Sequence, residues 1–474
     1  MGRLNNVYLN RYRLSGRIPM TLSDLNFIFR GLPLFLIIYY IFPAKAKPWV
    51  LLLASVLFYA LNDYLLLGVL IFFTFVNYFL GKLVSKEKKS AFIFSIILNA
   101  GLLIGFKVAG RLDKSILLPL GLSFYVFKMI SFQADLYRKR VCQFSFVNMA
   151  VYFSMFPQII SGPISRYDFV TANRFWIKGE EGTSKKERFF EILGNIEDGL
   201  RYFAIGLFMK VIVADHISAL WAELKTIGYE SISTPMAWIG AYTYSMNLYF
   251  DFWGYSLMAA GVGVMLGFPF IENFIQPYCA TSISDFYRRW HATLGSWFKD
   301  YIYIPLGGSK KGIVRTIFNL LVVWAITGIW HGMTVNFLIW AAVIFVIIVV
   351  EKFILSKHER LFKIIGRINV LVVIPCTWVI FTIHSIRKIG TYFLRLFPVI
   401  NNGIAVNEDD FLHFVPPYLP YLLIGLVLAM PFCQSFFRKY KDNVFVTLII
   451  FAMFWVSIFS LANSAGNPFM YLRF

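Results

Sequence analysis

Long apolar segments alternate with short polar, mostly basic segments along almost the whole chain. A membrane-spanning helix needs about 20 predominantly apolar residues, so segments of this kind predict helices that cross a bilayer. Two of them, 235–270 and 316–350, are each long enough for two crossings. The pattern predicts an all-α integral membrane protein with about 11–14 transmembrane segments. The apolar segments lie at 25–42, 49–61, 65–83, 91–106, 116–132, 149–163, 199–220, 235–270, 316–350, 368–383, 416–433 and 443–462.

The basic residues lie between the apolar segments rather than on one continuous face. A net charge of +20 would suit a nucleic-acid partner, but this distribution is typical of cytoplasmic loops that follow the positive-inside rule. We therefore expect the lipid bilayer as a partner and no nucleic acid. The segments 178–188 and 288–315 are predicted on the cytoplasmic side. The acidic, turn-rich segment 401–410 is predicted as an outer loop.

The composition excludes an ordinary soluble domain, because 58% of the residues are hydrophobic and 51 are phenylalanine. No long polar linker interrupts the apolar segments, which predicts one membrane domain over residues 21–474 behind a basic N-terminal extension, residues 1–20. The extension lacks a small-residue cleavage site and does not read as a removed signal peptide. The four cysteines are isolated, so we expect neither a disulfide framework nor a metal site.

His331 is the only readily titratable residue in the charge-free segment 316–350. An ionisable side chain at membrane depth is costly and normally faces a bundle interior or a watery cavity, which makes His331 a candidate functional residue. The alternative stays open, since a neutral imidazole can equally be a satisfied polar contact between helices. Gly328 and Gly332 flank the histidine, and because the segment is too long for one span, we expect the chain to bend there.

Residues 282–308, with the sequence SISDFYRRWHATLGSWFKDYIYIPLGG, are too polar to span a bilayer. We predict an amphipathic helix that starts at Ser282 with a capping box to Asp285 and lies in the interface or dips in from the cytoplasmic side. Its arginines either anchor it on anionic lipid or bind a phosphate-bearing or thioester donor. His291 lies about 100° round this helix from the apolar stripe, where a structural role is more common than catalysis. The stripe consists of Phe286, Trp290, Leu294, Trp297 and Tyr301.

Two further polar positions interrupt apolar segments. Asp251 lies inside 235–270, where a carboxylate should lie near water or be paired, with an arginine or a histidine proton. It is either a catalytic group or a buried hydrogen-bond acceptor. The segment 156–166, FPQIISGPISR, contains Gln158 and Ser161 and breaks a helix, which is tolerable in lipid only where protein or a water-filled cavity covers the backbone. It either lines a channel or simply ends a helix.

Motifs for nucleotide-driven work and for soluble hydrolases are missing from the sequence in any fitting context. There is no Walker loop, GxSxG elbow, HExxH or Rossmann glycine pattern. No inverted repeat of the kind that transporters show is visible either.

Several motifs occur in the order found in one protein family. They resemble the membrane-bound O-acyltransferase (MBOAT) family, and within it the bacterial alginate O-acetyltransferase-like branch, from about residue 25 to the end of the chain. The matching motifs are Arg288-Arg289-Trp290-His291, Trp297-Phe298-Lys299-Asp300-Tyr301, Ile304-Pro305-Leu306-Gly307-Gly308, Gly328-Ile329-Trp330-His331-Gly332, Phe156-Pro157-Gln158 with Ser161-Gly162-Pro163, Tyr249-Phe250-Asp251-Phe252 with Gly254-Tyr255-Ser256, and Asn467-Pro468-Phe469.

The resemblance implies a ring of helices around a funnel or channel in a bacterial cell membrane, with interfacial or re-entrant helices on the cytoplasmic side. It implies that His331 is the general base, with His291 as a second characteristic histidine. Such enzymes bind no cofactor and move an acyl group from a cytoplasmic donor, acetyl-coenzyme A or an acyl carrier, to a hydroxyl acceptor. In the bacterial branch an extracytoplasmic partner of the SGNH-hydrolase type acetylates a polysaccharide. Supporting or channel residues would be Asp251, Trp330, Gln158 and Ser161, and donor-binding residues would be Arg288, Arg289 and Lys299.

Some positions depart from the family's pattern. Trp253 stands where a small residue is common, and Leu257 stands where an acid is common, so any role of that acid is absent here. Lys299 replaces an arginine, and the two are not equivalent in bidentate anion binding. The basic extension before Thr21 has no counterpart in the family.

Two other functions remain as alternatives. D-alanyl transfer from a carrier protein to teichoic acid changes only the acyl group, and the sequence IPLGG at 304–308 favours acetyl transfer instead. A proton-coupled transporter or lipid flippase would use His331 and Asp251 as a proton relay.

Overall fold

The computed structural model describes residues 20–113, 115–176, 184–398 and 406–463. These segments are predominantly helical and contain no strand, so the predicted all-α class is confirmed. The N-terminal extension, apart from Met20, and the motif 467–469 lie outside the described residues, as does the first half of the predicted outer loop 401–410.

The chain forms two compact units, and each is described by itself. The first comprises the described residues up to Ile205 together with Tyr255–Glu272. The second comprises Gly206–Gly254 and the described residues from Asn273 onward. That residues 21–474 act as a single domain stays a prediction.

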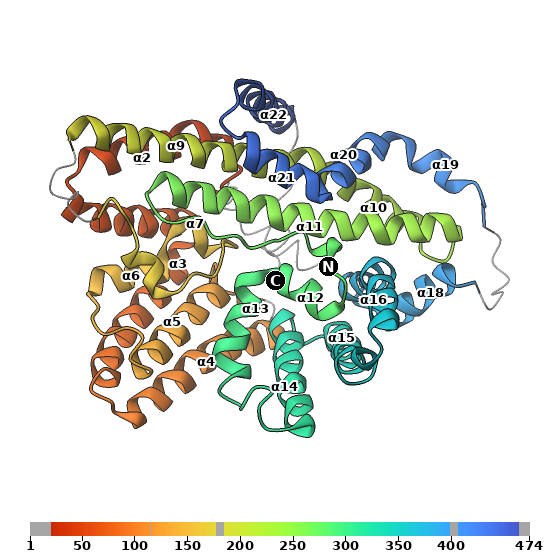
Figure 1. Cartoon of the computed structure of the whole chain (residues 1–474), viewed down its shortest axis with the longest axis horizontal. Coiled ribbons are helices and arrows are strands. Elements are labelled where there is room, and N and C mark those ends of the chain that lie inside the picture. The colour runs from red at the N-terminus through yellow and green to blue at the C-terminus, as the bar shows by residue number, and fades with distance from the viewer. Residues whose placement is uncertain (1–19, 114, 177–183, 399–405, 464–474) are drawn as a thin grey trace. The chain divides into compact units, whose positions relative to one another are not determined.

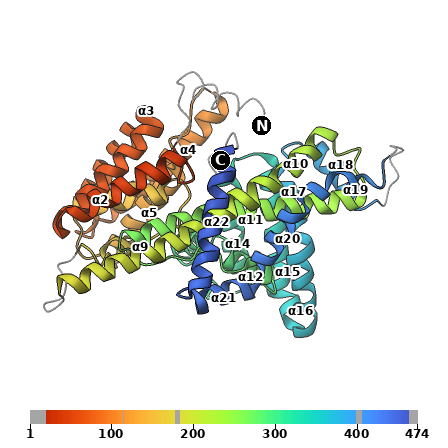
Figure 2. The ribbon, with the colours of Figure 1, turned by 90° about the horizontal axis from the view of Figure 1, so that it is seen from above.

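The first unit is a group of helices from the N-terminal part of the chain. They are α2 (Leu32–Ile41), α3 (Lys47–Val84), α4 (Lys89–Leu112), α5 (Leu122–Tyr137), α6 (Phe146–Ser154), α7 (Phe156–Ile159), α8 (Tyr167–Thr171) and most of α9 (Lys185–Phe208). Figures 1 and 2 show α3, α4 and α5 side by side. The buried amides of Asn77 in α3 and Asn99 in α4 exchange hydrogen bonds of 2.9 and 2.8 Å. Such pairs hold apolar helices together where lipid offers no hydrophobic drive.

The second unit contains the remaining helices. They are η3 (Met209–Ala214), α10 (Asp215–Ile227), part of α11 (Thr234–Met265), α12 (Ile283–Arg289), α13 (Ala292–Phe298), η5 (Lys299–Tyr303), α14 (Ile313–His331), α15 (Val335–Phe353), α16 (Glu359–Ile368), α17 (Ile374–Thr382), α18 (Ile386–Leu396), α19 (Asp410–Phe414), α20 (Leu419–Ala429), α21 (Pro431–Tyr440) and α22 (Val444–Asn463). Helix α15 packs against both α14 and α17. Gly328 allows the close approach of α14 to α15, because a Cβ there would lie 3.1 Å from the Ala341 Cβ.

Seven helical stretches of described residues are long and apolar enough to cross a membrane, or eight if the bent pair Pro416–Ala429 and Pro431–Tyr440 is one span. This is fewer than the about 11–14 spans predicted. The reason is that several apolar segments form shorter helices, as 149–163 does in α6 and α7. The seven are Ala44–Val84, Lys89–Leu112, Lys185–Ile227, Ile313–His331, Val335–Lys357, Glu359–Thr382 and Val444–Asn463.

The two longest apolar segments fold differently. The segment 316–350 forms two helices that meet at a turn beginning at Gly332, as predicted. The segment 235–270 does not hold two crossings, because residues 234–265 form one continuous helix of 32 residues, α11. That prediction was wrong because length alone does not make a turn, and no proline interrupts the helix after Pro235.

Candidate active site

His331 is the last residue of α14, and aromatic rings enclose its imidazole. The ring centroids of Trp330, Phe381, Trp340 and Phe337 lie 4.4, 5.0, 5.2 and 5.8 Å from that of His331. The residue is 8% exposed. The rings come from α14, α15 and α17, so the packing of three helices builds this aromatic enclosure. A reaction at His331 would therefore proceed away from bulk water.

One amide fixes two walls of the enclosure. Asn336, near the start of α15, donates from Nδ2 to the carbonyl oxygens of Phe381 at 2.8 Å and Ile380 at 3.3 Å. These carbonyls belong to the last turn of α17, which would otherwise lack partners. The bonds hold Phe337, the neighbour of Asn336, against Phe381, and the two ring centroids are 4.8 Å apart.

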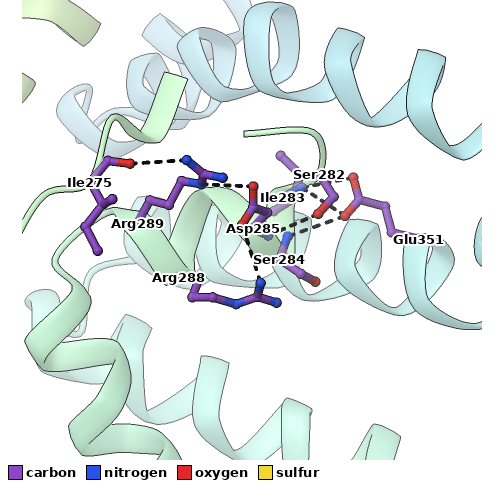
Figure 3. Close-up of polar contacts among 8 residues, drawn as sticks. All are labelled: Ile275, Ser282, Ile283, Ser284, Asp285, Arg288, Arg289 and Glu351. Atoms are coloured by element: carbon purple, nitrogen blue, oxygen red, sulfur yellow. Dashed lines mark hydrogen bonds and ion pairs between the residues drawn. The ribbon is translucent and has the colours of Figure 1, made fainter. Parts of the chain in front are cut away.

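A buried carboxylate near the C-terminal end of α15 contacts the start of α12 (Figure 3). Glu351, 1% exposed, accepts hydrogen bonds from the backbone N–H of Ile283 at 2.9 and 3.1 Å and from that of Ser284 at 3.5 Å. It also accepts one from Asn369 Nδ2 at 3.0 Å. A negative charge is favourable at a helix N-terminus, where backbone N–H groups have no partner within the helix. Glu351 therefore fixes where α12 begins.

The helix predicted from Ser282 starts as expected but does not continue. The side chain of Ser282 accepts a hydrogen bond from the Asp285 backbone N–H at 3.0 Å, so the predicted cap is confirmed. Helix α12 ends at Arg289, and α13 begins only at Ala292. The prediction of one amphipathic helix, with His291 on its flank, was wrong. Apolar spacing cannot reveal that the chain turns at His291, whose φ of +47° is left-handed.

His291 is held by the side chain of Asn273. Asn273 Oδ1 accepts from the backbone N–H of Thr293 at 3.3 Å, which identifies this atom as the oxygen, and it lies 3.0 Å from His291 Nδ1. Nδ1 is therefore the donor, and Nε2 keeps its lone pair. Nε2 is buried and has no hydrogen-bond partner among the described residues. Burial lowers the pKa of His291 to about 3, so the ring is neutral near pH 7.

Tryptophan rings connect the two histidines. Trp340, in contact with His331, lies 5.9 Å from Trp378, and Trp378 lies 5.0 Å from Trp290, the neighbour of His291 in the sequence. All these residues belong to the second unit. The structure thus places the two predicted histidines at the two ends of one aromatic column.

The predicted donor-binding residues differ in how they are held (Figure 3). Arg289 Nε contacts the Asp285 carboxylate at 3.0 Å, and its Nη1 donates to the Ile275 carbonyl oxygen at 3.5 Å. Arg288 contacts the same carboxylate only at 3.5 Å, and its side chain is 76% exposed. Lys299, at the start of η5, is exposed as well. Arg288 and Lys299 are therefore available to an anionic group, and Arg289 supports the local structure.

Asp251 is paired, as expected for a carboxylate in an apolar segment, and a partner in the structure is a lysine. Lys210 Nζ lies 2.9 Å from Asp251 Oδ1 and also contacts Asp215. The side chains of Lys210 and Asp251 are 2% and 3% exposed. Removing one member would strand a buried charge, which is strongly destabilising. The contact between Asp251 and Lys210 therefore fits a structural ion pair that joins α11 to η3.

Gln158 and Ser161 lie in the first unit and are buried there. Gln158 Oε1 accepts hydrogen bonds of 2.8 Å from Lys128 Nζ and from the Ser165 hydroxyl. Ser161 donates to the carbonyl oxygen of Ile160 at 2.7 Å. These contacts satisfy the side-chain oxygen of Gln158 and one backbone carbonyl of the segment 156–166.

Sequence reasoning missed three residues of the second unit. Glu351 was overlooked because a single charge just beyond an apolar segment resembles a boundary residue, and Lys210 was overlooked although it lies in the middle of the segment 199–220. His384 follows α17 and contacts a wall of the enclosure, since its ring lies 6.0 Å from that of Phe337. The signal that could have found all three is the same: an ionisable residue within or beside an apolar segment.

Comparisons with known proteins identify the class. Residues 51–387 match the model of the membrane-bound O-acyltransferase family, MBOAT. The chain belongs to this family. With its apolar helices, it is a multi-pass membrane protein and an O-acyltransferase.

Individual relatives support the same class. The chain is 33% identical over 389 residues to a probable alginate O-acetylase AlgI of Pseudomonas fluorescens, covering 80% of this chain and 76% of the relative. It is 34% identical over 363 residues to a peptidoglycan O-acetyltransferase of Helicobacter pylori, covering 66% and 67%. A teichoic acid D-alanyltransferase of Bacillus subtilis is 30% identical over 230 residues, covering 47% and 55%.

Proposed function

We propose that this enzyme transfers an acetyl group from a cytoplasmic thioester donor to a hydroxyl of an extracytoplasmic acceptor, with His331 as the general base. The buried imidazole in the aromatic enclosure carries this proposal, because it is the family's candidate base and is shielded from bulk water. The setting is the cytoplasmic membrane of a bacterium.

The chemical step needs one base and one acyl carrier. His331 takes the proton of the acceptor hydroxyl as its oxygen attacks the thioester carbonyl, the C–O bond forms, the C–S bond breaks, and the proton passes to the departing thiolate. General-base catalysis of this kind contributes about 10²- to 10⁴-fold. The thioester donor brings the acyl group in an activated form, so the proposed step requires no bound cofactor.

The donor binds on the side of α12. Arg288 is exposed and only loosely held by Asp285, so it is available for a phosphate of acetyl-coenzyme A or of an acyl carrier. The basic segment 288–315 places this end of the second unit on the cytoplasmic side under the positive-inside rule. The acyl group then passes to an extracytoplasmic partner of the SGNH-hydrolase type, or to a polysaccharide.

A second candidate is D-alanyl transfer from a carrier protein. The observation in its favour is the similarity to a teichoic acid D-alanyltransferase, which covers 47% of this chain. The O-acetylase relatives cover more, from 66% to 96% of this chain, and this difference favours acetyl transfer.

Membrane vesicles from the source bacterium test the proposal. Vesicles carrying the wild type, His331→Ala or His413→Ala are supplied with radiolabelled acetyl-coenzyme A or with carrier-bound labelled D-alanine, and the label in envelope esters is counted at equal protein level. His413 is an exposed histidine on α19 and serves as the matched control. We expect acetyl incorporation that falls about 10²- to 10⁴-fold in His331→Ala alone.

Each other outcome is informative. D-alanyl label incorporated in place of acetyl would establish the second candidate. Full incorporation by His331→Ala would overturn the role of His331 as base, and no incorporation of either label by the wild type would overturn the transfer itself.

A further inference from the structure

His384 lies between α17 and α18, beside the aromatic enclosure but outside it. Its ring centroid is 6.0 Å from that of Phe337, and the centroid of Phe337 is 5.8 Å from that of His331. Both imidazoles therefore lie near the same phenyl ring. Unlike His331, His384 is exposed.

The two histidines share one end of the helices, and α12 lies at the other. Asn336 ties the start of α15 to the last turn of α17, next to both histidines. Glu351, near the end of α15, ties that helix to the start of α12 (Figure 3). An α-helix rises about 1.5 Å per residue, so Asn336 and Glu351 lie roughly 22 Å apart along α15. A molecule that arrives beside His384 thus approaches from the end of α15 opposite to Glu351 and the start of α12.

Hydrogen bonds determine which ring nitrogen of His384 is available. Asn336 Nδ2 donates to two carbonyl oxygens, so its Oδ1 is the acceptor, and His384 Nδ1 lies 3.4 Å from it. Nδ1 therefore carries the hydrogen, and Nε2 carries a lone pair. In the part of the chain that the structure describes, this is the one hydrogen bond recorded for His384.

The charge state follows from the surroundings. Partial burial lowers the pKa of His384, and the positive charge of Lys225 in α10 lowers it further. The ring is therefore neutral near pH 7. A neutral Nε2 accepts a hydrogen bond, and a hydroxyl is a suitable donor for it.

We propose that His384 binds the acyl acceptor by accepting a hydrogen bond at Nε2 from a second hydroxyl of a polyhydroxylated, saccharide-like molecule, while His331 takes the proton of the reacting hydroxyl. This inference rests on the proposed function. The enclosed His331 is assigned to the reacting hydroxyl, and the exposed His384 is assigned to a second hydroxyl of the same molecule. An acceptor with a single hydroxyl gains nothing from His384.

This last consequence provides the test. The purified protein in proteoliposomes is given the acyl donor that supports transfer and either ethanol or methyl glucoside as the acceptor, and KM for each acceptor is measured. The variants are His384→Ala, His384→Gln, and His358→Ala, an exposed histidine beyond α15 that serves as the control. We expect His384→Ala to raise KM for methyl glucoside about five- to tenfold, the worth of one hydrogen bond, and to leave KM for ethanol unchanged.

The conservative variant separates binding from structure. The His384→Gln side chain presents an amide oxygen as acceptor and should recover part of the affinity for methyl glucoside. Equal KM values for methyl glucoside in the wild type and His384→Ala would overturn the assignment of His384 and leave the proposed function standing. A rise of KM for both acceptors would also overturn the assignment of His384, because such a rise would indicate that the substitution disturbs the aromatic enclosure. No transfer to either acceptor by the wild type would instead count against the proposed function.

Discussion

The two ends of the α14, α15 and α17 helices in the second unit are built on opposite principles. At one end, which we call the carboxylate end, Glu351 binds the first turn of α12, and Asp285 binds the arginines that follow. At the other, the histidine end, aromatic rings surround His331, and Asn336 supplies the polar contacts. Charge fixes the first end, and ring packing shapes the second.

The difference separates positioning from chemistry. At the carboxylate end, carboxylates bind the first backbone N–H groups of α12 and the guanidinium of Arg289, whereas Arg288 is exposed. At the histidine end, phenyl and indole rings lie beside the imidazole of His331. We therefore expect substitutions at the carboxylate end to act on stability and donor binding, and substitutions at the histidine end to act on turnover and acceptor binding.

The largest effect on stability is expected for Glu351→Ala. The substitution leaves the backbone N–H groups of Ile283 and Ser284 and the amide of Asn369 without their acceptor in a buried place. Each unsatisfied buried donor costs about 1–3 kcal/mol, so we expect a loss of at least about 3 kcal/mol and a clearly lower melting temperature in detergent.

Glu351→Gln is the matched control for this prediction. It keeps one acceptor oxygen and removes the charge, and it should melt between the wild type and Glu351→Ala. Equal melting temperatures for Glu351→Ala and the wild type would show that α12 is held by its apolar contacts alone, and the contrast between the two ends would fail.

A smaller effect should distinguish the two neighbouring arginines. Arg289→Ala removes contacts to Asp285 and to the Ile275 carbonyl oxygen, and we expect it to cost about 1 kcal/mol of stability. Arg288 is 76% exposed, so Arg288→Ala should leave the melting temperature unchanged and raise KM for the acyl donor several-fold. The reverse result, with donor KM raised only by Arg289→Ala, would exchange the roles of the two residues.

The sequence was sufficient for features that depend on local pattern. The helical class, the cap at Ser282 and the two helices of 316–350 are of this kind. The family assignment itself rested on those motifs and is confirmed. The roles of His331 and His291 stay predictions.

What the sequence could not supply depends on partners that are distant along the chain. The turn at His291 is accompanied by a bond to Asn273, 18 residues earlier, and the start of α12 is fixed by Glu351, 68 residues later. Asp251 meets Lys210 from another helix, which no periodicity reveals. His384 was not singled out for the same reason, because its significance comes from its spatial proximity to Phe337 and not from its neighbours in the sequence.

The smallest expected effect concerns the pH dependence of His291. Burial lowers its pKa to about 3, so the ring becomes protonated only below that pH and stays neutral wherever the enzyme can be assayed. His291→Asn keeps a donor near the position of Nδ1 and suits the left-handed backbone, but it lacks Nε2. We therefore expect a lower rate by the same factor at every pH between about 5 and 8, with the acid limb of the rate profile unmoved. An acid limb that shifts in this variant would mean that His291 is the titrating group, and the neutral state inferred from its burial would be wrong.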